Sequence, residues 1–227
     1  MEVRDLFSEE IILSAVTVLT AIIALWQTQR QIRLSNKQHL FDKRLEKYSL
    51  IDDLITLYKK NRNQLIDTED STKNDRTKEC IIMACDYYFE LLANVSYLAD
   101  MIFAIRVPLD PTNQNVLLSK LEMLKKSARE ISVLWKDDLG EEFSKFIYTY
   151  ADLLFKLYQQ KIRLVKAKDH ESYSYLQYNS DKAQEDIKNF AEKNSLFETI
   201  KALDDIYKKI ITEKRLAKLM KTLKLSC

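Results

Sequence analysis

The chain has 227 residues and a formal net charge of +2, with one glycine and two prolines. Such scarce turn-forming residues exclude β-rich and α/β folds, and with them the glycine-rich phosphate loops of nucleotide-binding enzymes. The abundant leucine, isoleucine, lysine and glutamate instead suit long amphipathic helices, so we expect an all-α protein.

The first predicted element is residues 11–26, whose sequence IILSAVTVLTAIIALW carries no charge. A helix of this length rises about 24 Å, slightly less than the hydrocarbon core of a bilayer. The acidic start disfavours a cleaved secretory signal, and the lack of a polar face disfavours a buried helix of a soluble bundle. We therefore predict a transmembrane helix over 11–26, preceded by an extracytoplasmic N-terminus, residues 1–10.

The basic residues on either side of residues 11–26 predict the orientation of this helix. Only Arg4 precedes it, whereas five basic residues follow it closely: Arg30, Arg33, Lys37, Lys43 and Arg44. Because positively charged flanks stay in the cytoplasm, the chain after Gln27 is expected there, with the N-terminus outside. The predicted location is the inner (plasma) membrane of a bacterium.

Small or weakly polar residues line one face of the predicted span. Ser14, Thr17, Ala21 and Ala24 follow one another at spacings of three and four, so anchors from several copies can pack along this face. The alternative is that small residues fall at these positions by chance. Trp26 stands at the end of the span, where an interfacial aromatic residue is expected.

One uninterrupted helix is expected to continue from the span to about Leu65, because neither glycine nor proline follows the anchor. From Phe41 onward the apolar residues recur every three or four positions on one stripe, and from Leu50 a second row widens it. A narrow stripe suits a single partner, whereas a wide one suits a bundle. We predict a solvated or self-pairing stalk over 27–47 and a cytoplasmic helical bundle over 48–207.

Helices and polar loops alternate through the rest of the predicted bundle. Pro108 and Pro111 are expected to end one helix, and Ser195 with Glu198 has the spacing of a capping box that starts the last one. This last helix is expected to run on into a basic tail. The predicted segments are loop 67–76, helix 77–106, helix 114–137 ending near Gly140, helix 141–167, loop 168–179, helix 181–193 and tail 208–227.

Most sequence signatures of enzymes are missing. There is no His-Glu-x-x-His or Cys-x-x-Cys motif, and the two histidines and three cysteines lack the spacing of a zinc site. Cys80 and Cys85 point about 140° apart on a helix, so we expect buried thiols rather than a redox pair. With Cys227 they make an odd, sparse set that fits a reducing compartment. We predict no metal and no cofactor.

One short motif offers an alternative, enzymatic interpretation. Arg163 and His170, separated by six residues, resemble the Arg-x(4–6)-His motif of HEPN ribonucleases, which are also all-helical. The resemblance implies that Arg163 binds the scissile phosphate while His170 transfers a proton. That family prefers a polar residue after the arginine, whereas Leu164 stands here. The corresponding hypothesis is a ribonuclease tethered to the membrane.

The tail combines basic and apolar residues at helical spacing. Its basic residues include Lys214, Arg215, Lys218, Lys221 and Lys224, interleaved with leucines. Such a helix can lie on anionic lipid, pair with the acidic body of the protein or bind nucleic acid. Lipid is favoured over nucleic acid, because an anchored protein already holds its tail close to a membrane.

The segment just after the span carries a second resemblance. KQHLFDKRLEKY, residues 37–48, resembles the juxtamembrane segment of uncharacterised bacterial single-pass membrane proteins, some of them found among antiphage defence genes. This resemblance implies no known reaction. Our first hypothesis is a non-enzymatic, membrane-tethered helical module that forms homo-oligomers or recruits a protein partner, as a sensor or as an effector acting on the membrane. The alternatives are the tethered ribonuclease and a soluble helical-bundle interaction protein.

Overall fold

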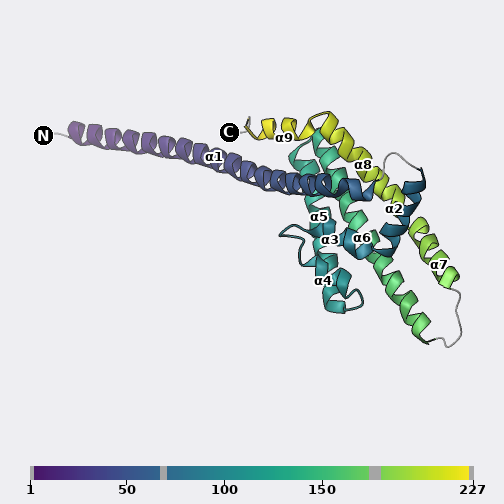
Figure 1. Cartoon of the computed structure of the whole chain (residues 1–227). Coiled ribbons are helices and arrows are strands. Elements are labelled where there is room, and N and C mark those ends of the chain that lie inside the picture. Colours follow the sequence, from purple (N-terminus) through teal and green to yellow (C-terminus); the bar gives the residue numbers. More distant parts are fainter. Residues whose placement is uncertain (1–2, 67–70, 174–179, 225–227) are drawn as a thin grey trace. The chain divides into compact units, whose positions relative to one another are not determined.

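The computed structural model describes residues 3–66, 71–173 and 180–224, and all regular elements in these ranges are α-helices (Figure 1). Side chains are described for residues 11–66, 76–167 and 185–223. The all-α prediction is confirmed. The helices are α1 Val3–Leu65, α2 Ser71–Met83, α3 Cys85–Ala93, α4 Met101–Arg106, α5 Pro111–Leu134, α6 Asp138–Tyr173, α7 Ser180–Lys193, α8 Leu196–Thr212 and α9 Arg215–Lys224.

The chain divides into two units, Met1–Glu46 with Lys221–Cys227, and Lys47–Met220. The prediction of one helix ending at about Leu65 is confirmed by α1. In its first part all side chains from residue 11 to residue 40 are exposed. From Lys47 onward burial becomes frequent, and Ile51, Leu54 and Tyr58 are completely buried. The wider apolar face recognised in the sequence is therefore the face that enters a core.

Helix α6 is the centre of the bundle, because it packs against α3, α5, α7 and α8. Figure 1 shows it as the long green helix beside α5. Two tyrosines on α6 bond to main chain elsewhere: Tyr150 Oη donates to the Leu92 carbonyl (2.7 Å), and Tyr158 Oη donates to the Pro108 carbonyl (2.8 Å). Each large apolar side chain buried on α6 stabilises the fold by about 2 kcal/mol. These side chains include Phe143, Phe146, Ile147, Leu154 and Leu157.

The start of α5 follows from local sequence. Asp110 is its N-cap, with a carboxylate oxygen that accepts a hydrogen bond from the Asn113 amide (2.9 Å), and Pro111 occupies the first turn. Proline is favoured there because its missing N–H would have no helical partner. The predicted stop between Pro108 and Pro111 is confirmed. The helix begins three residues earlier and ends three residues earlier than the expected 114–137.

The prediction of one helix over 77–106 is wrong, because the chain breaks twice within that range. At Ala84, between α2 and α3, the backbone leaves the helical region (φ −114°, ψ 36°). Asn94 ends α3, and a turn containing Ser96 follows, where short polar side chains compete with helical bonding. The turn also allows Leu98 and Met101 to be completely buried. The apolar spacing alone could not reveal these changes of register.

Three predictions for the C-terminal third need correction. The loop expected over 168–179 is helical through Tyr173, because α6 continues, and residues 174–179 lie outside the described part of the chain. Ser195 adopts a left-handed conformation (φ 54°), and its side chain makes no capping bond, so the capping box is wrong. The last helix enters the predicted tail but does not continue through it: α8 ends at Thr212, and Lys214 (φ 52°) separates it from α9. Helix 181–193 is confirmed within one residue by α7.

The single glycine is required by a close contact in the first turn of α6. A Cβ added to Gly140 would lie 1.8 Å from the carbonyl oxygen of Trp135, which is a main-chain atom that cannot rotate away. Trp135 itself is buried, and Gly140 donates its amide hydrogen to Asp137 Oδ1 (3.1 Å). The sequence predicted that a helix would end near Gly140. Instead, Gly140 lies in the first turn of α6 and permits the tight connection between α5 and α6.

We expect Gly140→Ala to lower the free energy of unfolding by about 2 kcal/mol, because the Trp135 carbonyl must move to admit the methyl group. Urea unfolding of the full chain in detergent, followed by Trp135 fluorescence in a Trp26→Phe background, measures the change. The control is Glu141→Ala, an exposed position in the same turn, which should alter stability by less than about 0.5 kcal/mol. Equal stability of the two variants would contradict the assignment.

Candidate functional site

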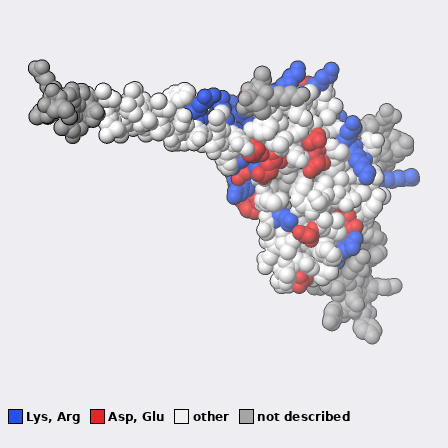
Figure 2. Space-filling model, turned by 90° about the vertical axis from the view of Figure 1, so that its left-hand side faces the viewer, with Lys and Arg blue, Asp and Glu red and all other residues white. Residues whose placement is uncertain are grey.

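The first candidate site is the uncharged segment of α1, residues 11–26. All of its side chains are exposed, including Ile11 (64%), Leu13 (70%) and Trp26 (60%). Figure 2 shows this stretch white, without a charged side chain, until the first basic residues of the stalk. By length and composition it is able to cross a membrane, and none of it is buried inside the protein. Exposed apolar surface of this extent marks an interaction site.

Polar groups in this segment are satisfied within the helix itself. The hydroxyl of Thr17 donates to the Leu13 carbonyl (2.8 Å), and the hydroxyl of Thr20 donates to the Val16 carbonyl (2.8 Å). Both bonds follow the i to i−4 pattern that serves hydroxyl groups in helices. Because hydrocarbon offers no hydrogen-bond partner, internal bonding of this kind is what a lipid-exposed helix requires.

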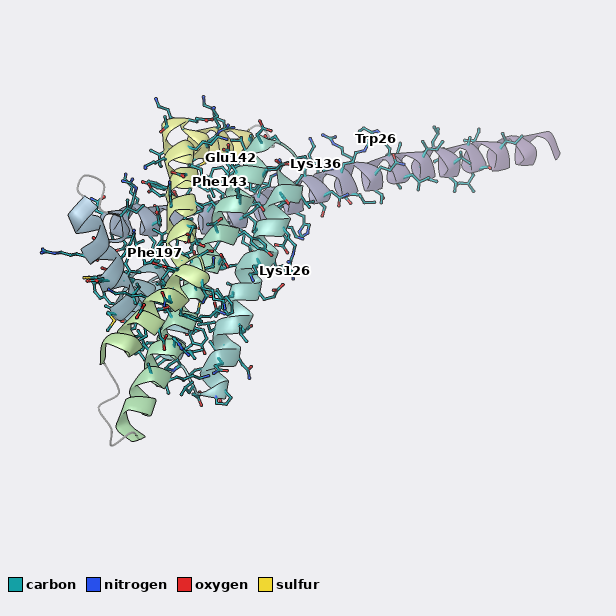
Figure 3. All side chains as sticks on the ribbon, turned by 90° about the vertical axis from the view of Figure 1, so that its right-hand side faces the viewer. Trp26, Lys126, Lys136, Glu142, Phe143 and Phe197 are labelled. Carbon is teal, nitrogen blue, oxygen red and sulfur yellow. The ribbon has the colours of Figure 1, made fainter. Side chains whose placement is uncertain are left out.

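The end of the segment combines an aromatic ring with a cation. Trp26 projects from α1 (Figure 3), and the guanidinium carbon of Arg30 lies 5.7 Å from its ring centroid. This distance permits a cation–π interaction, and the pair has the chemistry of the zone between hydrocarbon and water. The small residues recognised in the sequence are also exposed and share one face of α1: Ser14, Thr17, Ala21 and Ala24.

The second candidate site is a buried polar cluster that joins α1 to α8. Asp204 on α8 accepts two bonds from the Arg62 guanidinium, one of them from Nη2 to Oδ2 at 3.0 Å. Lys208 Nζ lies 2.8 Å from the same Oδ2, and Tyr58 Oη donates to Oδ1 (3.4 Å). Only 3% of the Asp204 side chain is exposed. The paired geometry of guanidinium and carboxylate gives this contact directional specificity.

Burial and the neighbouring charges have opposite effects on the pKa of Asp204. Burial raises the pKa of the Asp204 carboxyl, but hydrogen bonds from Arg62 and Lys208 outweigh it, so the pKa lies below its ordinary value of 3.8. Asp204 is therefore ionised at neutral pH. Burial and the Asp204 charge raise the pKa of Tyr58, which stays a neutral donor. The Tyr207 ring packs edge-on against Tyr58, with centroids 5.1 Å apart.

A groove of about 560 Å³ lies beside the cluster, between the end of α1, α2 and α8. Its apolar lining includes Leu65, Ile81 and Phe197, and Figure 3 labels the last of these. Three acidic and three basic side chains also line it, so its net charge is near zero. This lining does not match a phosphate or a metal ion, both of which require an excess of one sign. The charged residues are Lys78, Lys201, Lys208, Glu198, Asp204 and Asp205.

The motif suggested for ribonuclease activity lies on α6. Arg163 is exposed, and Leu164 beside it is buried. Because α6 is helical through Tyr173, positions 163 and 170 are about 10 Å apart along its axis. The His170 side chain lies outside the described part of the structure. Arg163 lines neither of the grooves described here, one beside Asp204 and a smaller one beside Glu142.

The cysteines also differ from one another. Cys85 is buried, as expected, and burial raises the pKa of its thiol to about 12, so it stays protonated and unreactive. Cys80 is exposed, which contradicts the expectation of a buried thiol, and both are free. Cys227 lies outside the described residues. Among the residues whose structure is described, three His, Cys, Asp or Glu side chains nowhere gather as metal ligands would.

The basic tail residues fall into two groups. Arg215 is only 15% exposed and forms ion pairs with Glu142 (3.1 Å) and Glu213 (2.6 Å). Lys214, Lys218 and Lys221 are exposed. The side chain of Lys224 lies outside the described part. Lys209 on α8 also pairs with Glu142, which is labelled in Figure 3.

Comparison of the chain with protein-family models, curated proteins and solved structures finds no match. The apolar segment and the tail were recognised in the sequence, but the cluster around Asp204 was not. Arg62 and Asp204 are 142 positions apart, and no local pattern connects them. The only available signal was an acid directly after the buried Leu203, at the edge of an apolar stripe.

We expect Asp204→Ala to lower the free energy of unfolding by about 3 kcal/mol, because Arg62 loses its partner in a partly buried site. Asp205→Ala is the control, since Asp205 is exposed and adjacent on α8. Urea unfolding at pH 7 measures both. Folding lowers the pKa of Asp204, so the stability that its charge contributes is lost in acid. The difference in free energy of unfolding between wild type and Asp204→Asn should therefore narrow below pH 3.8. If this difference in free energy of unfolding did not change with pH, Asp204 would not be ionised in the folded protein.

Proposed function

We propose that this chain is a single-pass membrane protein, anchored by residues 11–26, whose helical body acts in the cytoplasm without catalysing a reaction. The observation that carries the proposal is the exposed, uncharged segment of α1, none of which is buried. In water, each exposed isoleucine or leucine of this segment is unfavourable by about 2 kcal/mol relative to an apolar environment. A bilayer removes that penalty for every side of the helix at once.

The flanking charges support the proposed orientation. Basic residues beginning at Arg30 follow the segment, whereas Arg4 is the only base before it. The cation–π contact between Arg30 and Trp26 suits the cytoplasmic boundary of the membrane. We place the body in the bacterial cytoplasm on this basis, and residues 1–10 outside.

A role in recruitment or in membrane perturbation agrees with the chemistry of the body. Cys85 is held protonated, and the groove beside Asp204 is lined by charges that cancel. Neither feature activates a nucleophile. The face formed by Ser14, Thr17, Ala21 and Ala24 allows anchors of several copies to pack together. The resemblance of residues 37–48 to proteins encoded among antiphage defence genes motivates the proposal of a sensor or effector in bacterial defence.

We expect the full chain to remain with the membrane fraction after carbonate extraction. Leu19→Lys/Ile22→Lys places two charges in the middle of the span, which costs about 5 kcal/mol on insertion scales and should release the chain. Leu118→Lys/Val133→Lys, at exposed apolar positions of α5, is the matched control and should stay in the pellet. Release of the wild type would exclude the anchor and support the soluble alternative.

Induction in a bacterial host distinguishes an effector from a ribonuclease. We expect growth arrest with the wild type and with His170→Ala, and normal growth with Leu19→Lys/Ile22→Lys, because the activity requires the membrane. Immunoblots confirm that all three chains accumulate equally. Arrest that disappears in His170→Ala, at a normal protein level, would replace the proposed function by RNA cleavage through Arg163 and His170.

A further inference from the structure

Helix α9 has two opposite faces with different environments. Leu219 and Leu223 are buried on one of them, at 0% and 2% exposure. Lys218 and Lys221 are exposed, and their spacing of three places them together on the other face. Lys214, in the turn before α9, is exposed as well. The apolar face of the tail is therefore already occupied within the protein, whereas the basic face is turned to its surroundings.

The basic residues of this region differ in whether an acid neutralises them. Lys208 pairs with Asp204, and Lys209 and Arg215 pair with Glu142. The three outward lysines form no ion pair with any side chain that the structure describes. Their positive charges are thus available to a partner, whereas Lys208 pairs within α8, and Lys209 and Arg215 connect α8 and the start of α9 to Glu142 on α6.

The turn before α9 explains why this helix has buried leucines but exposed lysines. Lys214 adopts a left-handed conformation (φ 52°), and its amide donates to the Ile211 carbonyl (3.1 Å). The turn resets the helical register after α8, so that Leu219 is buried while Lys218 remains exposed. Left-handed backbone is unfavourable for a lysine, and its presence here indicates that packing on both sides determines the turn.

The arrangement of these charges indicates the chemistry of the partner. Lys218 and Lys221 lie about 5 Å apart along the axis of α9, and Lys214 precedes its first turn, so the three lysines are spread along the tail rather than gathered at one point. A surface carrying many separate negative charges fits this spacing better than a single phosphate. The outward face holds neither arginine nor an aromatic side chain, the residues with which proteins stack on exposed bases of nucleic acids.

We propose that Lys214, Lys218 and Lys221 form an electrostatic contact with anionic phospholipid headgroups of the leaflet that faces the body. This inference rests on the proposed anchoring, which keeps the tail at high local concentration next to that leaflet. Because Leu219 and Leu223 are buried in the protein, the contact involves no insertion of α9 into the bilayer. It is therefore sensitive to salt and to headgroup charge.

The test uses the full chain reconstituted into vesicles of phosphatidylcholine alone or with phosphatidylglycerol. Vesicles are washed with carbonate and floated, and lysine acetylation is then followed residue by residue by mass spectrometry. We expect acetylation of Lys214, Lys218 and Lys221 to slow about fivefold with phosphatidylglycerol, and the effect to vanish in high salt. Lys126 and Lys136, exposed on the body and labelled in Figure 3, are internal controls and should not change.

A pair of variants tests whether the lysines act as one surface. In the variant Lys218→Gln/Lys221→Gln, phosphatidylglycerol should no longer protect Lys214 from acetylation. In the control variant Lys126→Gln/Lys136→Gln, this protection of Lys214 should remain. Equal acetylation in the two lipid mixtures, in chains that float after the wash, would overturn this inference alone. Chains that fail to float would overturn the anchoring as well. Protection by added single-stranded RNA in phosphatidylcholine vesicles, but not by phosphatidylglycerol, would replace lipid by nucleic acid as the partner.

Discussion

The carboxylate of Asp204 is nearly removed from water, and it remains ionised because Arg62, Lys208 and Tyr58 surround it with donors. A buried ion pair contributes little net stability, since desolvation offsets much of its attraction, and an apolar replacement is often as stable. The pair instead specifies how two helices pack, because the two bonds between Arg62 and Asp204 are formed in only one register of α1 against α8. We interpret the pair as the contact that determines how the last turns of α1 are seated in the bundle. Helix α8, which carries Asp204, is also packed against α6 and α7.

Helix α1 presents two different kinds of surface along its length. Over residues 11–26, α1 exposes apolar side chains in every direction and bonds its threonine hydroxyls to its own carbonyls, as a helix in hydrocarbon must. After Lys47, one side of α1 packs in a core through Ile51, Leu54 and Tyr58, while other positions remain exposed, as in a helix of a water-soluble bundle. The change occurs without a break in α1, so the exposed apolar segment and a core element are parts of one helix. No other helix in the described part of the chain has a comparable uncharged span.

Helices with a regular apolar pattern over several turns were predictable from the sequence, whereas breaks at which a few residues change the register were not. The continuous stripes of α1 and α6 predicted both helices, and the pair Pro108 and Pro111 predicted the stop before α5. The breaks at Ala84 and Lys214 were not predictable, because neither residue is a helix breaker and tertiary packing imposes both turns. The same distinction applies to the candidate sites. The uncharged segment is a local property and was found, whereas the cluster around Asp204 depends on residues distant in sequence.

The overall charge of +2 conceals how the charges are distributed. Acidic side chains of the body neutralise several bases of the tail: Glu142 forms ion pairs with both Lys209 and Arg215. Without these acids, Lys209 and Arg215 would lack their ion pairs with α6. With them, the inner face is neutral and the outer face keeps the charges of Lys214, Lys218 and Lys221. The acids of the body thus neutralise part of the basic tail. The three exposed lysines, which form no ion pair with the side chains that the structure describes, are suited to an anionic surface outside the chain.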